Sequence, residues 1–131
     1  MTDIERRITA CHEASHCRFA FAVGVGISEV TIDGKNASFT PTASGWVRLL
    51  SSEFNIAVVF SAGSLGQKHF FPDVTNGDNV RDDRRLKYLC REKNRRKGRE
   101  FVVEQLKDPR VIGDIERLTD RLLIDGTIRF V

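Results

Sequence analysis

The residue types that could carry out chemistry are concentrated in one short stretch near the start of the chain, His12-Glu13-Ala14-Ser15-His16. On a helix, histidines four residues apart lie one turn apart on the same face, so a ring nitrogen of each can reach one metal ion. The glutamate between them is then placed beside a water molecule on that metal, where its carboxylate can accept a proton. The spacing therefore predicts a metal centre with His12 and His16 as ligands and Glu13 as the catalytic base.

The segment around this motif is predicted to be a helix. Thr2 and Glu5 have the spacing of a capping box, and Gly24 and Gly26 should stop the helix after about residue 21 or 23. Steps of 100° per residue form one apolar stripe from Ile4, Ile8, His12, His16, Phe19 and Val23. The histidines fall inside this stripe, so the alternative interpretation is a pair of core histidines that bond to backbone carbonyls.

A catalytic zinc site has three protein ligands and one open position, so a third ligand must come from later in the chain. A histidine six residues after His16, as in metzincins, is absent because position 22 is alanine. The remaining candidates are Glu29, Glu53, His69, Asp82 and Asp83. Asp82 is preferred, because it shares a predicted helix face with apolar residues and needs a partner there. The alternative is a first-turn carboxylate that the helix dipole stabilises.

The first elements after the motif helix are predicted to be strands. Residues 27–32 alternate between apolar and polar like a half-buried strand, and Asp33-Gly34 is typical of a turn. Residues 37–40 could return as a second strand, which would complete a small hairpin. Residues 41–46 are predicted to be loop or edge material, because Pro41 ends regular strand pairing.

The rest of the chain is predicted to be helical. A buried helix over residues 53–62 should begin after Ser51-Ser52 and end near Gly63 or Gly66. A turn-rich loop at 70–79 precedes helices over about 80–95, 99–107 and 109–124. The expected fold class is α+β, mainly α-helical with a small β-hairpin or sheet, in a single domain over residues 1–131.

The composition is that of an ordinary globular protein. Of 131 residues, 30% are charged and 40% hydrophobic, and a net charge of +3 is too small to indicate a nucleic-acid partner by itself. The N-terminus lacks the form of a secretory signal, and no apolar run approaches the roughly 20 residues that span a bilayer. Cys11, Cys17 and Cys90 contain no Cys-x-x-Cys pair, so we expect core thiols in a cytoplasmic protein rather than metal ligands.

The order of these elements resembles the peptidase domain of the FtsH-type membrane-anchored, ATP-dependent zinc metalloproteases. The motif at 12–16 resembles the family's His-Glu-Ala-Gly-His, and residues 27–32 resemble its strand that ends in Val-Thr-Ile. Residues 56–66 resemble its apolar helix that runs into a Gly- and Ala-rich turn. Residues 77–89 resemble its Gly-rich loop and Asn-Asp-Leu segment, and residues 118–127 resemble its C-terminal helix and Gly-Thr turn.

The resemblance implies a zinc metalloendopeptidase, a hydrolase with an HExxH-type helical fold. It implies one Zn²⁺ per chain, held by His12, His16 and Asp82, with Glu13 as general base. Apolar positions at +4 and +7 from the family's aspartate select Asp82 over Asp83. The expected substrate is a peptide or unfolded protein, bound by edge addition to the strand at 27–32. A protein partner could supply this substrate, and neither a membrane nor a nucleic acid is expected to be a partner.

The chain departs from the family's pattern at several positions. Ser15 replaces a glycine, which should be tolerated at an exposed helix position, and Gln67 and Lys68 stand where the family carries glutamates. Residues 63–68 lack the Gly-Lys-Ser/Thr phosphate cradle of an ATPase, and no membrane anchor is recognised. The resemblance therefore implies a free-standing peptidase-like domain without the family's ATPase.

Two other functions are compatible with the sequence. A degenerate relative could keep the metal and act as a regulator or adaptor through a protein partner. A nucleic-acid-binding protein could use the basic run of Lys87, Arg91, Lys93, Arg95, Arg96, Lys97 and Arg99. Only Tyr88 offers base stacking nearby, however, and such a run is more typical of a solvated helix end. The sequence does not specify an oligomeric state.

Overall fold

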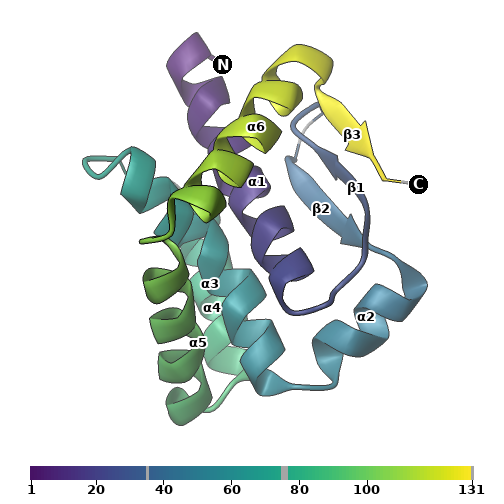
Figure 1. Cartoon of the computed structure of the whole chain (residues 1–131), viewed down its shortest axis with the longest axis vertical. Helices are drawn as coiled ribbons and strands as arrows, with labels where there is room; N and C mark the ends of the chain where they lie inside the picture. The colour runs from purple at the N-terminus through teal and green to yellow at the C-terminus, as the bar shows by residue number, and fades with distance from the viewer. Residues whose placement is uncertain (35, 75–76, 131) are drawn as a thin grey trace.

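The computed structural model describes residues 1–34, 36–74 and 77–130, and over these residues it contains six helices and one three-stranded antiparallel sheet (Figure 1). The fold is therefore α+β and mainly helical, as the sequence predicted. Helix α1 (Asp3–Ala22) packs against the sheet and against α3 (Glu53–Phe70) and α6 (Pro109–Asp125). Because α1 carries the His-Glu-x-x-His motif, the motif is placed at the centre of the molecule.

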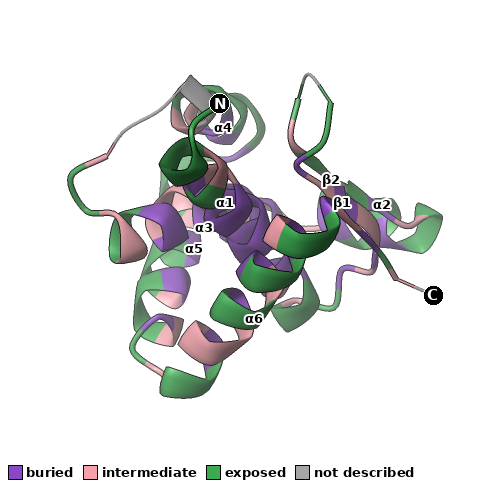
Figure 2. Ribbon diagram, turned by 90° about the horizontal axis from the view of Figure 1, so that it is seen from above, coloured by how far each residue is buried: buried purple, intermediate pink, exposed green. Residues whose placement is uncertain are grey.

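Helix α1 begins as its sequence predicts. The Thr2 side chain accepts a hydrogen bond from the Glu5 backbone N–H, and the Glu5 carboxylate accepts one from the Thr2 backbone N–H. Ile4, at the start of the predicted stripe, is exposed, whereas every residue from Ala10 to Cys17 is buried. Figure 2 shows this burial along α1 and α3. The middle of α1 is buried on all sides because α3, α6 and the sheet surround it.

Helix α3 (Glu53–Phe70) runs past Gly63 and Gly66, where the sequence predicted its end. Both glycines face α1. A Cβ atom at Gly63 would lie 2.6 Å from His12 Nε2, and one at Gly66 would lie 2.6 Å from Ser15 Cβ. The glycines therefore serve the close approach of two helices rather than a helix stop. The resulting contact between α1 and α3 is the main interface of the core.

Residues 41–46 were predicted to be loop or edge material. Pro41 is the last residue of an edge strand, β2 (Ser38–Pro41), but residues 43–46 begin a short helix, α2 (Ala43–Leu50). Thr42 caps it by accepting a hydrogen bond from the Gly45 backbone N–H at 2.9 Å. Ser52 caps α3 in the same way through Asn55, as predicted for Ser51-Ser52. Among the described helices none alone could cross a membrane, and only α2 and α3 together, bent by 108°, have the length and composition for it.

The helix predicted over residues 80–95 is divided into α4 (Gly77–Leu89) and α5 (Glu92–Gln105). The break lies at Arg91, whose backbone N–H donates to Glu53 Oε1 at 2.6 Å and whose guanidinium contacts Glu53 Oε2 at 3.0 Å. Glu53 belongs to α3, so a tertiary contact ends one helix and begins the next. Gly98 consequently lies inside α5, against Ala57 of α3. Helix α6 (Pro109–Asp125) matches its predicted limits.

The sheet has the order β2-β1-β3, formed by β1 (Ile27–Thr31), β2 (Ser38–Pro41) and β3 (Thr127–Arg129). The β1–β2 hairpin was predicted, but the third strand was predicted only as a turn. In the central strand, Glu29 pairs with Thr40 on one side and Arg129 on the other. Strand β1 therefore has no free edge, and the predicted addition of a peptide to residues 27–32 is wrong. The edge strands are β2 and β3.

Candidate metal centre

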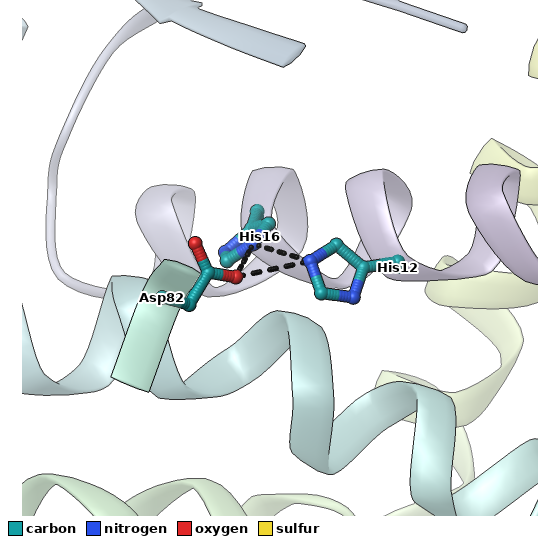
Figure 3. Close-up of side chains that lie close together, drawn as sticks. All are labelled: His12, His16 and Asp82. Atoms are coloured by element: carbon teal, nitrogen blue, oxygen red, sulfur yellow. Dashed lines mark hydrogen bonds and ion pairs between the residues drawn. The ribbon is translucent and has the colours of Figure 1, made fainter. Parts of the chain in front are cut away.

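Three side chains from two distant segments converge on one point (Figure 3). His12 and His16 project from successive turns of α1, and Asp82 projects from α4 toward both of them. Asp82 Oδ2 lies 3.0 Å from His12 Nε2 and 2.9 Å from His16 Nε2, and the two Nε2 atoms are 3.1 Å apart. All three side chains are buried, with exposed fractions of 1%, 1% and 6%. The group could hold a metal ion.

The protonation of both imidazoles is fixed by oxygen atoms behind the rings. His16 Nδ1 lies 2.6 Å from the Val59 carbonyl oxygen, and His12 Nδ1 lies 3.1 Å from Gln67 Oε1. These oxygens only accept hydrogen bonds, so each Nδ1 must carry a proton and donate it. In the neutral rings, each Nε2 then presents a lone pair toward the other Nε2 and toward the Asp82 carboxylate. In this tautomer all three atoms are acceptors, and a cation bound between them would satisfy all three.

The charges of His16 and Asp82 also favour a cation at this point. Burial lowers the pKa of His16, but the hydrogen bond to Asp82 and its charge outweigh burial and raise that pKa to about 8. Burial raises the pKa of Asp82, but hydrogen bonds from His12 and His16 hold it well below its usual range. Positive charge is therefore favoured at this point. Two imidazole nitrogens and one carboxylate oxygen are ligand types of a zinc site with one open position.

The space for an ion exists because residue 63 has no side chain. A Cβ atom there would come within contact distance of both histidine Nε2 atoms, 2.6 Å from that of His12. Helix α3 therefore passes behind the converging ligand atoms without filling the point that they surround. The donor set and this space both fit a metal ion.

The other candidates for a third ligand point elsewhere. Asp83 contacts Arg99 at 2.9 Å and Lys87 at 3.7 Å, on the surface of α4. His69 is exposed at the end of α3, with its ring 5.1 Å from that of Phe70. Glu29 pairs with Arg129, and Glu53 pairs with Arg91. Among the described residues, only Asp82 joins the two histidines.

Glu13 lies in the same pocket as the three ligands. Its side chain is 4% exposed and, with His12, His16 and Asp82, lines a cavity of about 130 Å³. The charge of Glu13 contributes to the raised pKa of His16, which is consistent with a carboxylate close to that ring. Phe39 of β2 covers the other side of His16, with ring centroids 4.8 Å apart. The Glu13 carboxylate, the three candidate ligands and a small cavity therefore lie together.

Two residues beside the motif have roles that the sequence did not predict. Gln67 is fully buried and its Oε1 accepts the hydrogen bond from His12 Nδ1, so it orients a ligand. Ser15, expected at an exposed position, is also fully buried. Its Oγ donates to the Cys11 carbonyl at 2.8 Å, and the side chain packs against Gly66. The small residue at position 66 makes room for the serine. A signal for Gln67 was available, since it lies four residues after Gly63 and therefore on the same face of α3.

The chain matches no protein-family model, and it matches no curated protein. Its resemblance to the FtsH-type peptidase domain therefore stays a prediction.

The remaining residues noted in the sequence lie away from this pocket. The three cysteines are buried and free, and burial raises the pKa of Cys11 and of Cys17 to about 12, as expected for core thiols. Several members of the basic run have partners within the chain. Lys87 and Arg99 pair with Asp83, Arg91 pairs with Glu53, and Arg95 donates to the Cys90 carbonyl. These contacts resemble those of a solvated helix end.

Replacing Gln67 with Leu is expected to weaken zinc binding by about 10- to 100-fold, the usual effect of losing a residue that orients a metal ligand. The variant would lose the acceptor that keeps the His12 ring in place and its Nδ1 protonated. Competition with a chromophoric chelator would measure the affinity. Gln67→Glu keeps an acceptor and should bind zinc within a few-fold of wild type, and equal weakening in both variants would contradict the orienting role.

Proposed function

We propose that this chain is a zinc-dependent metallopeptidase that hydrolyses internal peptide bonds, similar to the FtsH-type peptidase domain. The convergence of His12, His16 and Asp82, with Glu13 in the same pocket, carries the proposal. A metal site that only stabilises the fold would be closed by a fourth protein ligand. Here the described residues supply three ligand atoms, and a cavity lies beside them.

His12, His16 and Asp82 would hold the ion. When bound, zinc supplies Lewis-acid chemistry, because it polarises a carbonyl and lowers the pKa of a water molecule toward about 7. Glu13 would take the proton from the attacking water and deliver it to the leaving amine, as a general base and then a general acid. Gln67 and the Val59 carbonyl keep both histidines in the tautomer that ligation requires.

A peptide substrate would bind along β2. This strand is an edge of the sheet among the described residues, and its residues Ser38 and Phe39 line the cavity that contains the ligands. Backbone hydrogen bonds to an edge strand hold a substrate in an extended conformation with little dependence on its sequence. The predicted mode of binding is therefore kept, but it is assigned to β2 in place of the paired strand β1.

Purified protein is expected to contain about one zinc ion per chain and to cleave an unfolded substrate such as casein or a quenched fluorescent peptide. Elemental analysis would measure the metal. A chelator should abolish cleavage, and added zinc should restore it. Zinc retained without any cleavage would contradict the peptidase and would indicate instead a metal-binding domain that acts through a protein partner. Absence of both zinc binding and cleavage would overturn the metal centre itself.

A further inference from the structure

The cavity beside the ligands has two different walls. The wall formed by β2 and α2 contains Phe39 and Trp46, and Phe60 of α3 lies beside them. The part of the lining that belongs to α4 contains Arg81 and Arg85, one turn apart and on either side of Asp82 in the sequence. A peptide that lies along β2 would thus meet both an apolar surface and two guanidinium groups.

Among the side chains that the structure describes, no carboxylate forms an ion pair with either of these guanidinium groups. Other arginines of the chain, such as Arg91 and Arg99, do form ion pairs. The described lining contains two carboxylates, Glu13 and Asp82. A divalent metal ion would balance their charges and leave both arginines uncompensated. The pocket would then have a net positive charge.

The position of Arg85 supports a binding role. Its guanidinium carbon lies 5.6 Å from the centre of the Phe60 ring, a cation–π contact that places the group at the cavity. A guanidinium group suits the recognition of a carboxylate, because two of its N–H groups can match the two oxygens. Arg81, one turn earlier on α4, presents a second positive charge to the same volume.

We propose that Arg81 and Arg85 bind a carboxylate of the substrate, so that the site prefers peptides with a negative charge beside the bond that is cleaved. The inference rests on the proposed peptidase function and specifies its substrate class. The carboxylate could belong to an Asp or Glu side chain or to the free C-terminus of a peptide. Both groups are carboxylates, and a comparison of peptides that carry one or the other would distinguish the two sources.

The test uses two pairs of quenched peptides. In the first pair, one peptide has Glu on both sides of the central bond and the other has Gln at these positions. In the second pair, the bond lies next to the C-terminus, which is a free carboxylate in one peptide and an amide in the other. Wild type should cleave a carboxylate-bearing form with a kcat/KM roughly 10- to 100-fold above that of its neutral counterpart, the effect of one or two charge-assisted hydrogen bonds. This preference should decrease as salt is added.

The double variant Arg81→Gln, Arg85→Gln should bring the ratio of kcat/KM for the charged peptide to kcat/KM for the neutral peptide close to one. Arg84→Gln is the matched control, because Arg84 lies on the same helix, is exposed, and does not line the cavity. Circular dichroism and zinc content would show that each variant is folded. Equal cleavage of charged and neutral peptides by wild type, or a preference that survives the double variant, would overturn the inference and leave the peptidase proposal intact.

A binding measurement separates failure of this inference from failure of the proposed function. Fluorescence anisotropy of labelled peptides on the zinc-loaded Glu13→Gln protein reports affinity without turnover. Tighter binding of the charged peptide that depends on Arg81 and Arg85 would support carboxylate recognition even if wild type cleaves nothing. Equal binding of charged and neutral peptides would contradict it, whatever the outcome of the cleavage assay.

Discussion

Glu13→Gln is expected to lower peptide hydrolysis by about 10²- to 10⁴-fold, the usual contribution of a positioned general base. The amide has nearly the same shape as the carboxylate but cannot take a proton from water at neutral pH. Glu13 is buried in the cavity beside the two histidines and Asp82, so a carboxylate from the solvent could not reach the same position and act as the base. Initial rates on the neutral quenched peptide, at saturating zinc, would measure the effect.

The same variant should retain zinc, because Glu13 is not one of the three converging ligands. This separates loss of a base from loss of the metal. Elemental analysis of wild type and Glu13→Gln should therefore give equal zinc per chain. Equal hydrolysis rates in the two proteins would show that Glu13 is not the base. A parallel loss of zinc and rate would instead indicate a structural role for Glu13 in the centre.

Asp82→Ala is expected to weaken zinc binding by more than about 100-fold. Loss of a residue that only hydrogen-bonds to a metal ligand costs up to roughly 100-fold, and Asp82 is proposed to be a ligand itself. Asp82 contributes the only carboxylate among the converging ligand atoms, and its removal leaves two histidines from one helix. Asp83→Ala is the matched control. Asp83 is the next residue in the chain, but it pairs with Arg99 and Lys87 at the surface, so its loss should leave zinc binding unchanged.

Thermal unfolding gives a second measurement of the same difference. A ligand that binds only the folded protein stabilises it by about 2.7 kcal/mol at a concentration of 100 times its Kd. Zinc should therefore raise the Tm of wild type and of Asp83→Ala, but not that of Asp82→Ala at the same concentration. Full zinc-dependent stabilisation of Asp82→Ala would remove this residue from the ligand set.

Features set by neighbours in the chain could be predicted from the sequence. The capping box of Thr2 and Glu5 and the i,i+4 spacing of His12 and His16 depend only on helical geometry, and both are present in α1. The limits of α6 were predicted for the same reason, because Pro109 at its start and Gly126 at its end act locally. The hairpin of β1 and β2 was also predicted, since its turn residues and alternation lie within about 15 positions.

Features that depend on contacts between distant segments were decided by the tertiary structure. Gly63 and Gly66 have the local chemistry of a helix stop, yet α3 continues because α1 packs closely against both. Glu53 divides the predicted helix at Arg91 through a contact 38 residues away in sequence. Strand β3 exists because Thr127–Arg129 pairs with β1, and this pairing covers the free edge of β1 and leaves β2 and β3 as the edge strands.

The metal centre combines both kinds of information. Its two histidines and the proposed base Glu13 were predicted from one helical turn of sequence, because residues four apart on a helix must share a face. The sequence favoured Asp82 as the third ligand, but only the packing of α4 against α3 brings its carboxylate to within 3.0 Å of both histidines and turns Asp83 away. The contact of Gln67 with His12, and the space that Gly63 leaves beside both histidines, are seen only in the tertiary structure. Periodicity determines which residues of one helix lie together, whereas the approach of two helices is decided by the packing of side chains between them.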